Sequence, residues 1–146
     1  MGPDFFVIVR DAFEGFVAGV GGERSTTVHA RGLKVWFDGD TREHYEAQVI
    51  RVDGALQLEI GFHAEHAKAV QNDAALARLL ACEQTWRQDL GDDAVAGDFI
   101  GRVGWRRISE LWPLPETDDI DEAIETAARL ADYVIALEDL RRPPNR

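Results

Sequence analysis

The stretch His44-Tyr-Glu-Ala-Gln-Val-Ile-Arg-Val-Asp-Gly-Ala-Leu-Gln-Leu-Glu-Ile-Gly-Phe-His63 decides the fold. At its middle, Asp53-Gly54 predicts a tight hairpin turn, because glycine accepts the positive φ that such a turn needs. Apolar and polar residues alternate after the turn, and less cleanly before it. One apolar face and one polar face are typical of an antiparallel sheet that is covered on a single side. The apolar positions are Tyr45, Ala47, Val49, Leu56, Leu58, Ile60 and Phe62.

Two more segments predict strands. Residues 26–37 are rich in β-branched and aromatic side chains and end at the turn residues Asp38-Gly39-Asp40. Residues 99–111 predict one strand or two, with Gly101 and Gly104 as bend points.

Apolar side chains at helical spacing predict three helices, over residues 10–20, 67–90 and 118–140. Thr117 or Asp118 is the expected cap of the last helix. Residues 5–9 are either a short leading strand or an apolar lead-in to the first helix. The predicted order is helix, three strands, helix, strand, helix (α-β-β-β-α-β-α). It indicates an α+β fold with an antiparallel sheet and helices packed on one face.

Length and composition limit the classes of protein to which the chain can belong. A chain of 146 residues is one domain, which we place at residues 1–140, followed by a frayed tail at 141–146. The net charge of -11 argues against non-specific nucleic-acid binding, because a duplex would be repelled. The single cysteine, Cys82, excludes an intramolecular disulfide framework and a cysteine zinc cluster. The sequence shows neither a signal segment nor an apolar stretch of about 18 residues, so we expect a cytoplasmic protein without membrane contact.

Histidines form the first candidate site. His44, His63 and His66 lie in or just after the predicted hairpin, and with Glu59 or Glu65 they could hold zinc or another divalent ion. Such a site would belong to a metal-binding protein or a metal-dependent hydrolase. The simpler interpretation, which the sequence favours, is that these histidines are surface or turn residues on a polar sheet face.

Arginine and tryptophan side chains form the second candidate. Arg102 and Arg106 alternate with Trp105, a pattern that can bind an anion or stack on a base, provided that these side chains line a pocket. We favour the alternative that the arginines pair with the surplus acids. Trp36 lies on the opposite side of its strand from the apolar residues and is a candidate partner-binding residue if that side is exposed. The opposing interpretation places Trp36 and Trp105 in the core.

Catalytic motifs are sparse. The two serines, Ser25 and Ser109, lie outside a nucleophile elbow, and no phosphate-binding glycine loop is present. We therefore expect no cofactor. The leading hypothesis is a non-catalytic interaction or regulatory domain that binds a protein partner or itself, as a homo-oligomer. The alternative is the metal-dependent hydrolase or metal-binding protein.

Two resemblances accompany these inferences. Residues 31–62, 75–80, 99–101 and 105–115, the last including Trp-Arg-Arg-Ile-Ser-Glu-Leu-Trp-Pro, resemble small single-domain hypothetical proteins of high-GC actinobacteria, a group without an assigned activity. The order of elements is similar to that of the small acidic chaperones of bacterial secretion systems and the related sensory-type domain. That likeness of topology implies a homodimer that binds extended partner segments.

Overall fold

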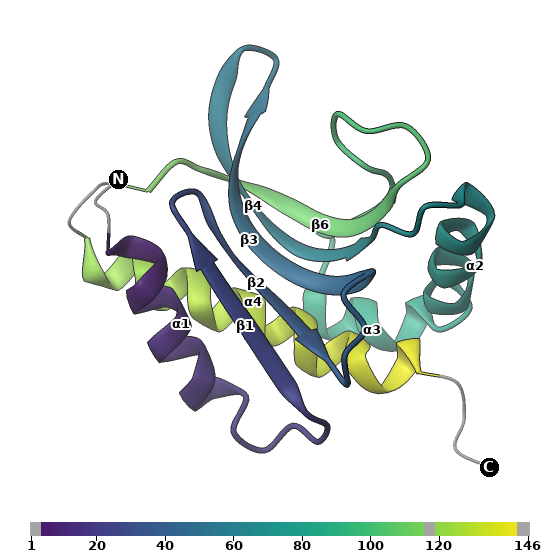
Figure 1. The fold of residues 1–146 in the computed structure, drawn as a ribbon, viewed down its shortest axis with the longest axis horizontal. Coiled ribbons are helices and arrows are strands. Elements are labelled where there is room, and N and C mark those ends of the chain that lie inside the picture. Colours follow the sequence, from purple (N-terminus) through teal and green to yellow (C-terminus); the bar gives the residue numbers. More distant parts are fainter. Residues whose placement is uncertain (1–3, 116–118, 143–146) are drawn as a thin grey trace.

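The computed structural model describes residues 4–115 and 119–142 and confirms the α+β class (Figure 1). Six antiparallel strands form one sheet in the order β1-β2-β3-β4-β6-β5. The strands are β1 (Arg24–His29), β2 (Gly32–Phe37), β3 (Glu43–Val52), β4 (Ala55–Ala64), β5 (Val95–Asp98) and β6 (Arg106–Pro113). The helices are α1 (Phe5–Phe16), α2 (Ala69–Leu80), α3 (Glu83–Leu90) and α4 (Ile120–Arg141).

The central hairpin follows the sequence prediction. Asp53 and Gly54 both have positive φ, 50° and 83°, and they join β3 to β4. Counting back from this turn sets the register and places His44 directly opposite His63. The predicted strand at 26–37 is a hairpin of two strands, β1 and β2, whose ends meet at His29 and Gly32.

Helix α1 begins earlier than predicted and ends earlier. Residues 5–9, predicted as a strand or a lead-in, are helical, and the helix stops at Phe16 rather than at residue 20. The reason is the apolar spacing of Phe5, Phe6, Val9 and Phe13, which buries one face of the longer helix.

The long helix predicted over 67–90 is two helices, with a break at Ala81-Cys82. At the break the carbonyl of Leu79 accepts two hydrogen bonds, one of 3.0 Å from the backbone N–H of Cys82 and one of 2.7 Å from the buried indole N–H of Trp86. Because a buried indole needs an acceptor, the interrupted helix satisfies Trp86 better than a continuous one.

The prediction for residues 99–111 is wrong in its boundaries. The first strand of this pair, β5, precedes Phe99, and β6 begins only at Arg106. Residues 99–105 form a loop in which Gly101 and Gly104 adopt positive φ of 83° and 88°. The expectation that Arg102 and Arg106 share a strand face therefore fails, because Arg102 lies in the loop.

The structure decides which sheet face is covered. Helices α1 and α4 pack on each other, and between them they contact β1, β2, β3 and β4. Most apolar residues on this face of the strands are buried against these helices, and the helices bury one apolar face each in return. We call the opposite side the polar face and define it by His44, Glu46, Gln48, Glu59, His63 and Ser109, which alternate with the core residues along β3, β4 and β6.

The C-terminal helix differs slightly from its prediction. Its cap is Asp119, whose carboxylate accepts from the backbone N–H groups of residues 121 and 122; the predicted caps, Thr117 and Asp118, lie outside the described residues. Arg141, assigned to a frayed tail, is the last helical residue and pairs with Glu138 at 2.8 Å. Residues 143–146 lie outside the described part of the chain. None of the described helices is both long and apolar enough to span a lipid bilayer.

Candidate metal centre

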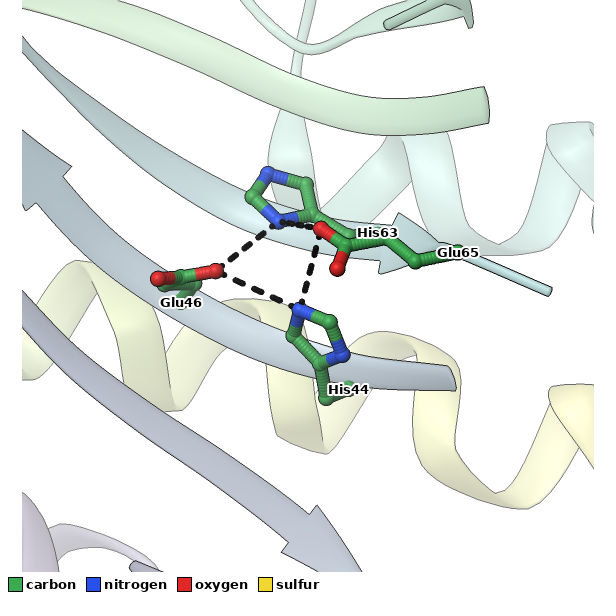
Figure 2. A group of neighbouring side chains, drawn as sticks. All are labelled: His44, Glu46, His63 and Glu65. Atoms are coloured by element: carbon green, nitrogen blue, oxygen red, sulfur yellow. Dashed lines mark hydrogen bonds and ion pairs between the residues drawn. The ribbon is translucent and has the colours of Figure 1, made fainter. Parts of the chain in front are cut away.

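Two histidines meet on the polar face at the end of the central hairpin. His44 on β3 and His63 on β4 are register partners, their ring centroids are 5.4 Å apart, and both side chains are fully buried. Glu46 lies two residues after His44 on the same face of β3. Glu65 follows the end of β4 and places its carboxylate beside the two rings, on the side away from Glu46 (Figure 2).

These four side chains offer one donor atom each to a common centre. The atoms are His44 Nε2, Glu46 Oε1, His63 Nδ1 and Glu65 Oε2, and all lie within 4.8 Å of one another. Nitrogen and oxygen alternate around the group: each histidine nitrogen is 3.2 Å from the Glu46 oxygen and 3.3 Å from the Glu65 oxygen. We call this group the four-donor cluster.

Hydrogen bonds outside the cluster orient both rings. His44 Nδ1 lies 3.0 Å from the backbone carbonyl of Thr41, and His63 Nε2 lies 3.0 Å from Glu59 Oε2. Both oxygens accept hydrogen bonds, so each outer nitrogen carries the proton. In a neutral imidazole the inner nitrogen then presents a lone pair to the centre, the arrangement found in metal-ligating histidines.

Glu59 is itself held in place. Its Oε2 accepts from the Ser109 hydroxyl at 2.7 Å, and its Oε1 accepts from the Gln48 amide at 2.9 Å. Arg107 donates to the same Ser109 hydroxyl at 2.8 Å and brings a positive charge close to this carboxylate. The carboxylate of Glu59 is therefore fixed against His63 and cannot turn away.

The carboxylates of the four-donor cluster favour a positive charge at its centre. Burial would raise the pKa of Glu46 and Glu65, but hydrogen bonds from His44 and His63 outweigh it. They hold the pKa of Glu46 well below its ordinary value and lower that of Glu65 to about 2. Burial likewise opposes charge on His63, yet the charge of Glu59 and the hydrogen bonds of the surrounding carboxylates raise its pKa well above the ordinary value. Without a cation, a proton on His63 supplies positive charge there.

Two segments close over the cluster. The Phe99 ring, from the loop between β5 and β6, packs against His63 with centroids 4.7 Å apart. Hydrogen bonds from the side chain of Asn72 on α2 hold the segment that carries Glu65, and the Asn72 side chain is fully buried. The Asn72 amide accepts from the His66 N–H at 2.7 Å and donates to the His66 carbonyl at 3.0 Å and the Gly104 carbonyl at 2.9 Å.

The structure brings together part of the predicted set of ligands. His44, His63 and Glu65 converge, whereas Glu59 acts on His63 from outside. His66 is not in the cluster, because its Nε2 pairs with Glu43 at 2.7 Å on the other side of the sheet. The sequence interpretation that placed these histidines on the surface is wrong for His44 and His63, which are fully buried.

Sequence reasoning missed Glu46 as a ligand, although a signal was present. The chain carries two His-x-Glu triplets, at residues 44–46 and 63–65, and their histidines lie at equal distances from the turn at Asp53-Gly54. A two-residue hairpin turn places these two histidines opposite each other, and the period of two puts Glu46 on the same face of β3 as His44.

The second predicted group lies apart from this cluster. Trp36 is half-buried on the polar-face side of β2 and does not belong to the hydrophobic core. Arg106 pairs with Asp73 at 2.8 Å, as expected for an arginine that balances surplus acids. Arg102 is exposed and stacks on Trp105, with its guanidinium carbon 4.2 Å from the ring centroid.

Comparison of the chain with family models, curated proteins and solved structures finds no match, so its function is inferred from its own residues.

Proposed function

We propose that the protein binds one divalent transition-metal ion at the four-donor cluster. The observation that carries this proposal is the direction of the donor atoms: two imidazole lone pairs and two carboxylate oxygens face one buried point. Carboxylates accept hydrogen bonds but do not donate them, so with neutral histidines the four atoms would only repel one another. A divalent ion turns each of these repulsions into a bond and balances the charges of Glu46 and Glu65.

The donor set indicates the class of metal. Imidazole nitrogen suits zinc, iron, copper and nickel, whereas magnesium and calcium prefer sites built from oxygen alone. Zinc ligands lie about 2.0–2.1 Å from the ion, so neighbouring corners of a zinc tetrahedron are about 3.3–3.4 Å apart. Four of the six separations between donor atoms, those of 3.2 and 3.3 Å between His44 or His63 and the two carboxylates, are close to this value, and the other two lie within 4.8 Å. Zinc is therefore the ion we assign first.

A structural role fits this site better than hydrolysis. Four protein donors complete the tetrahedron of a zinc ion and keep no position for water or substrate, whereas catalytic zinc sites use three protein ligands. The ion would tie the β3–β4 hairpin to the segment after β4. This is a metal-binding function without catalysis, so the hydrolase is the less supported form of the metal hypothesis.

The test is a zinc titration of the metal-free protein, followed by calorimetry and by native mass spectrometry. We expect one zinc ion per chain. Glu65→Gln removes one donor charge while keeping the side-chain size, and we expect it to weaken zinc binding by about 100-fold or more, beyond the range for changes to groups that only support a ligand. Glu125→Gln is the matched control, because Glu125 is exposed on α4 and outside the cluster. Equal zinc affinity in all three proteins would refute the proposal.

A second candidate function is the interaction domain, in which a protein partner or a second copy of the chain docks on the open part of the polar face. Trp36 supports it, because this large aromatic side chain is partly exposed and lies outside the core. We expect Trp36→Ala to leave the thermal midpoint nearly unchanged and to abolish self-association measured by analytical ultracentrifugation. A wild-type protein that stays monomeric at high concentration would remove the case for a homo-oligomer.

A further inference from the structure

A hollow of about 500 Å³ opens between the β5–β6 loop and the start of α2. This volume falls within the range of small-molecule sites. The hollow does not include any member of the four-donor cluster, so a ligand could bind there whether or not the protein binds metal. The residues around it are Ala69, Asp98, Phe99, Gly101, Arg102, Val103, Gly104 and Arg106.

The guanidinium of Arg102 in this hollow is held in place by a column of rings. The column starts at the buried ring of His63, continues through Phe99 at 4.7 Å and Trp105 at 5.2 Å, and ends where Arg102 lies over Trp105 at 4.2 Å. The two ring pairs are edge-to-face, a favourable arrangement for aromatic side chains. An exposed arginine is usually mobile, but this one rests on a support rooted in the sheet, which lowers the entropy cost of binding a ligand.

Charge is distributed unevenly between the two arginines of the hollow. Arg106 is compensated twice, by Asp73 at 2.8 Å and by Asp98 at 3.6 Å. No carboxylate of the described residues lies within ion-pair distance of Arg102, although the chain has 27 acidic residues against 16 lysines and arginines. An oriented and uncompensated guanidinium at the wall of a small-molecule-sized hollow is suited to a planar or tetrahedral oxyanion.

We propose that this hollow binds a small molecule through an oxyanion group, a phosphate or a carboxylate, which Arg102 holds. Arg106 adds a second positive charge, and the exposed carboxylate of Asp98 competes with the ligand for it. Phe99 and Val103 offer apolar contact to the remainder of the ligand.

The experiment is an NMR titration of the ¹⁵N-labelled protein with inorganic phosphate, and separately with acetate, against chloride at matched ionic strength. We expect saturable shifts of the Gly101 and Gly104 amides and of the Trp105 indole. The anion that gives the tighter binding identifies the group. Absence of saturable shifts with both anions would overturn the proposal.

Three variants make the test specific. Arg102→Gln should weaken binding by about 10-fold or more, because it removes a charge-assisted hydrogen bond. Asp98→Asn should tighten it, because it removes the competing carboxylate. Arg51→Gln removes an exposed charge at the end of β3 beside the β3–β4 turn, outside the hollow, and should change affinity by less than about 2-fold, because salt screens distant charges. If Arg51→Gln weakens binding as much as Arg102→Gln, the anion responds to general charge and the proposal fails. Unchanged amide shifts elsewhere in Arg102→Gln confirm that this variant is folded.

Discussion

Replacing Glu59 by glutamine separates the charge of the outer carboxylate from its hydrogen bonds. In the wild-type protein Glu59 accepts from three donors, on His63, Ser109 and Gln48. A glutamine at 59 can keep its carbonyl oxygen against His63 and Ser109 and donate its amide to Gln48, provided that the Gln48 amide flips. The hydrogen bonds then survive, and only the negative charge behind His63 is lost.

The magnitude follows from linkage. At a zinc concentration 100 times its dissociation constant, the wild-type protein gains about 2.7 kcal/mol. For a chain of this length that raises Tm by about 5–11 °C, at about 2–4 °C per kcal/mol. Loss of an outer carboxylate costs about 10–100-fold in metal affinity. At the same zinc concentration Glu59→Gln therefore gains only about 0.4–1.4 kcal/mol, or about 1–6 °C.

The assay is differential scanning calorimetry with and without zinc. Glu59→Ala is the companion variant: it strands three donors, so we expect it to lower Tm even in the absence of metal, by about 1–3 kcal/mol for each buried donor that finds no other acceptor. A zinc-dependent rise in Tm for Glu59→Gln that equals the wild-type rise at every concentration would refute the claim that Glu59 supports a metal ligand.

Three further changes have definite expected outcomes. Burial opposes ionisation of Glu110, but hydrogen bonds, led by the one from Arg129, lower the pKa of its carboxyl in the folded protein. The ionised Glu110 therefore stabilises the fold at any pH above the ordinary glutamate pKa of about 4.3, and this stabilisation is lost as the pH falls through the lowered pKa of the folded state. Urea unfolding should show Glu110→Gln less stable at pH 7 by about 2–3 kcal/mol, with the difference shrinking below pH 4; a difference that does not change with pH contradicts this. Asn72→Ala should lower the free energy of unfolding by about 2–4 kcal/mol and weaken zinc binding, because the segment that carries Glu65 loses the hydrogen bonds that hold it. Calorimetry that shows an unchanged zinc affinity would contradict the expected effect on metal binding. Gly61→Ala places a Cβ 2.5 Å from the Ser109 Cα on the neighbouring strand, so we expect a loss of about 3 kcal/mol or more, and circular dichroism melting at the wild-type temperature would contradict it.

The central hairpin of the sheet could be predicted from the sequence, because alternation along a strand and the chemistry of a tight turn depend only on residues close together in the chain. Alternation along residues 55–63 and the turn at Asp53-Gly54 set the hairpin, the α+β class and the facing of His44 and His63. The predicted boundaries were wrong where a buried side chain or the shape of a loop decided them. The helix break at Ala81-Cys82 depends on the indole of Trp86, and the start of β6 depends on a loop whose shape Gly101 and Gly104 permit.

The sequence by itself determined that His44, Glu46 and His63 lie on the polar side of one hairpin, since register and the period of two follow from the turn. Only the tertiary structure decided that this polar side is buried there. Glu65 lies one residue beyond the end of β4 and Phe99 lies in the loop between β5 and β6, and no local pattern encodes where these two side chains pack. Their packing removes water from His44 and His63 and turns an ordinary polar sheet face into a cluster that needs a cation.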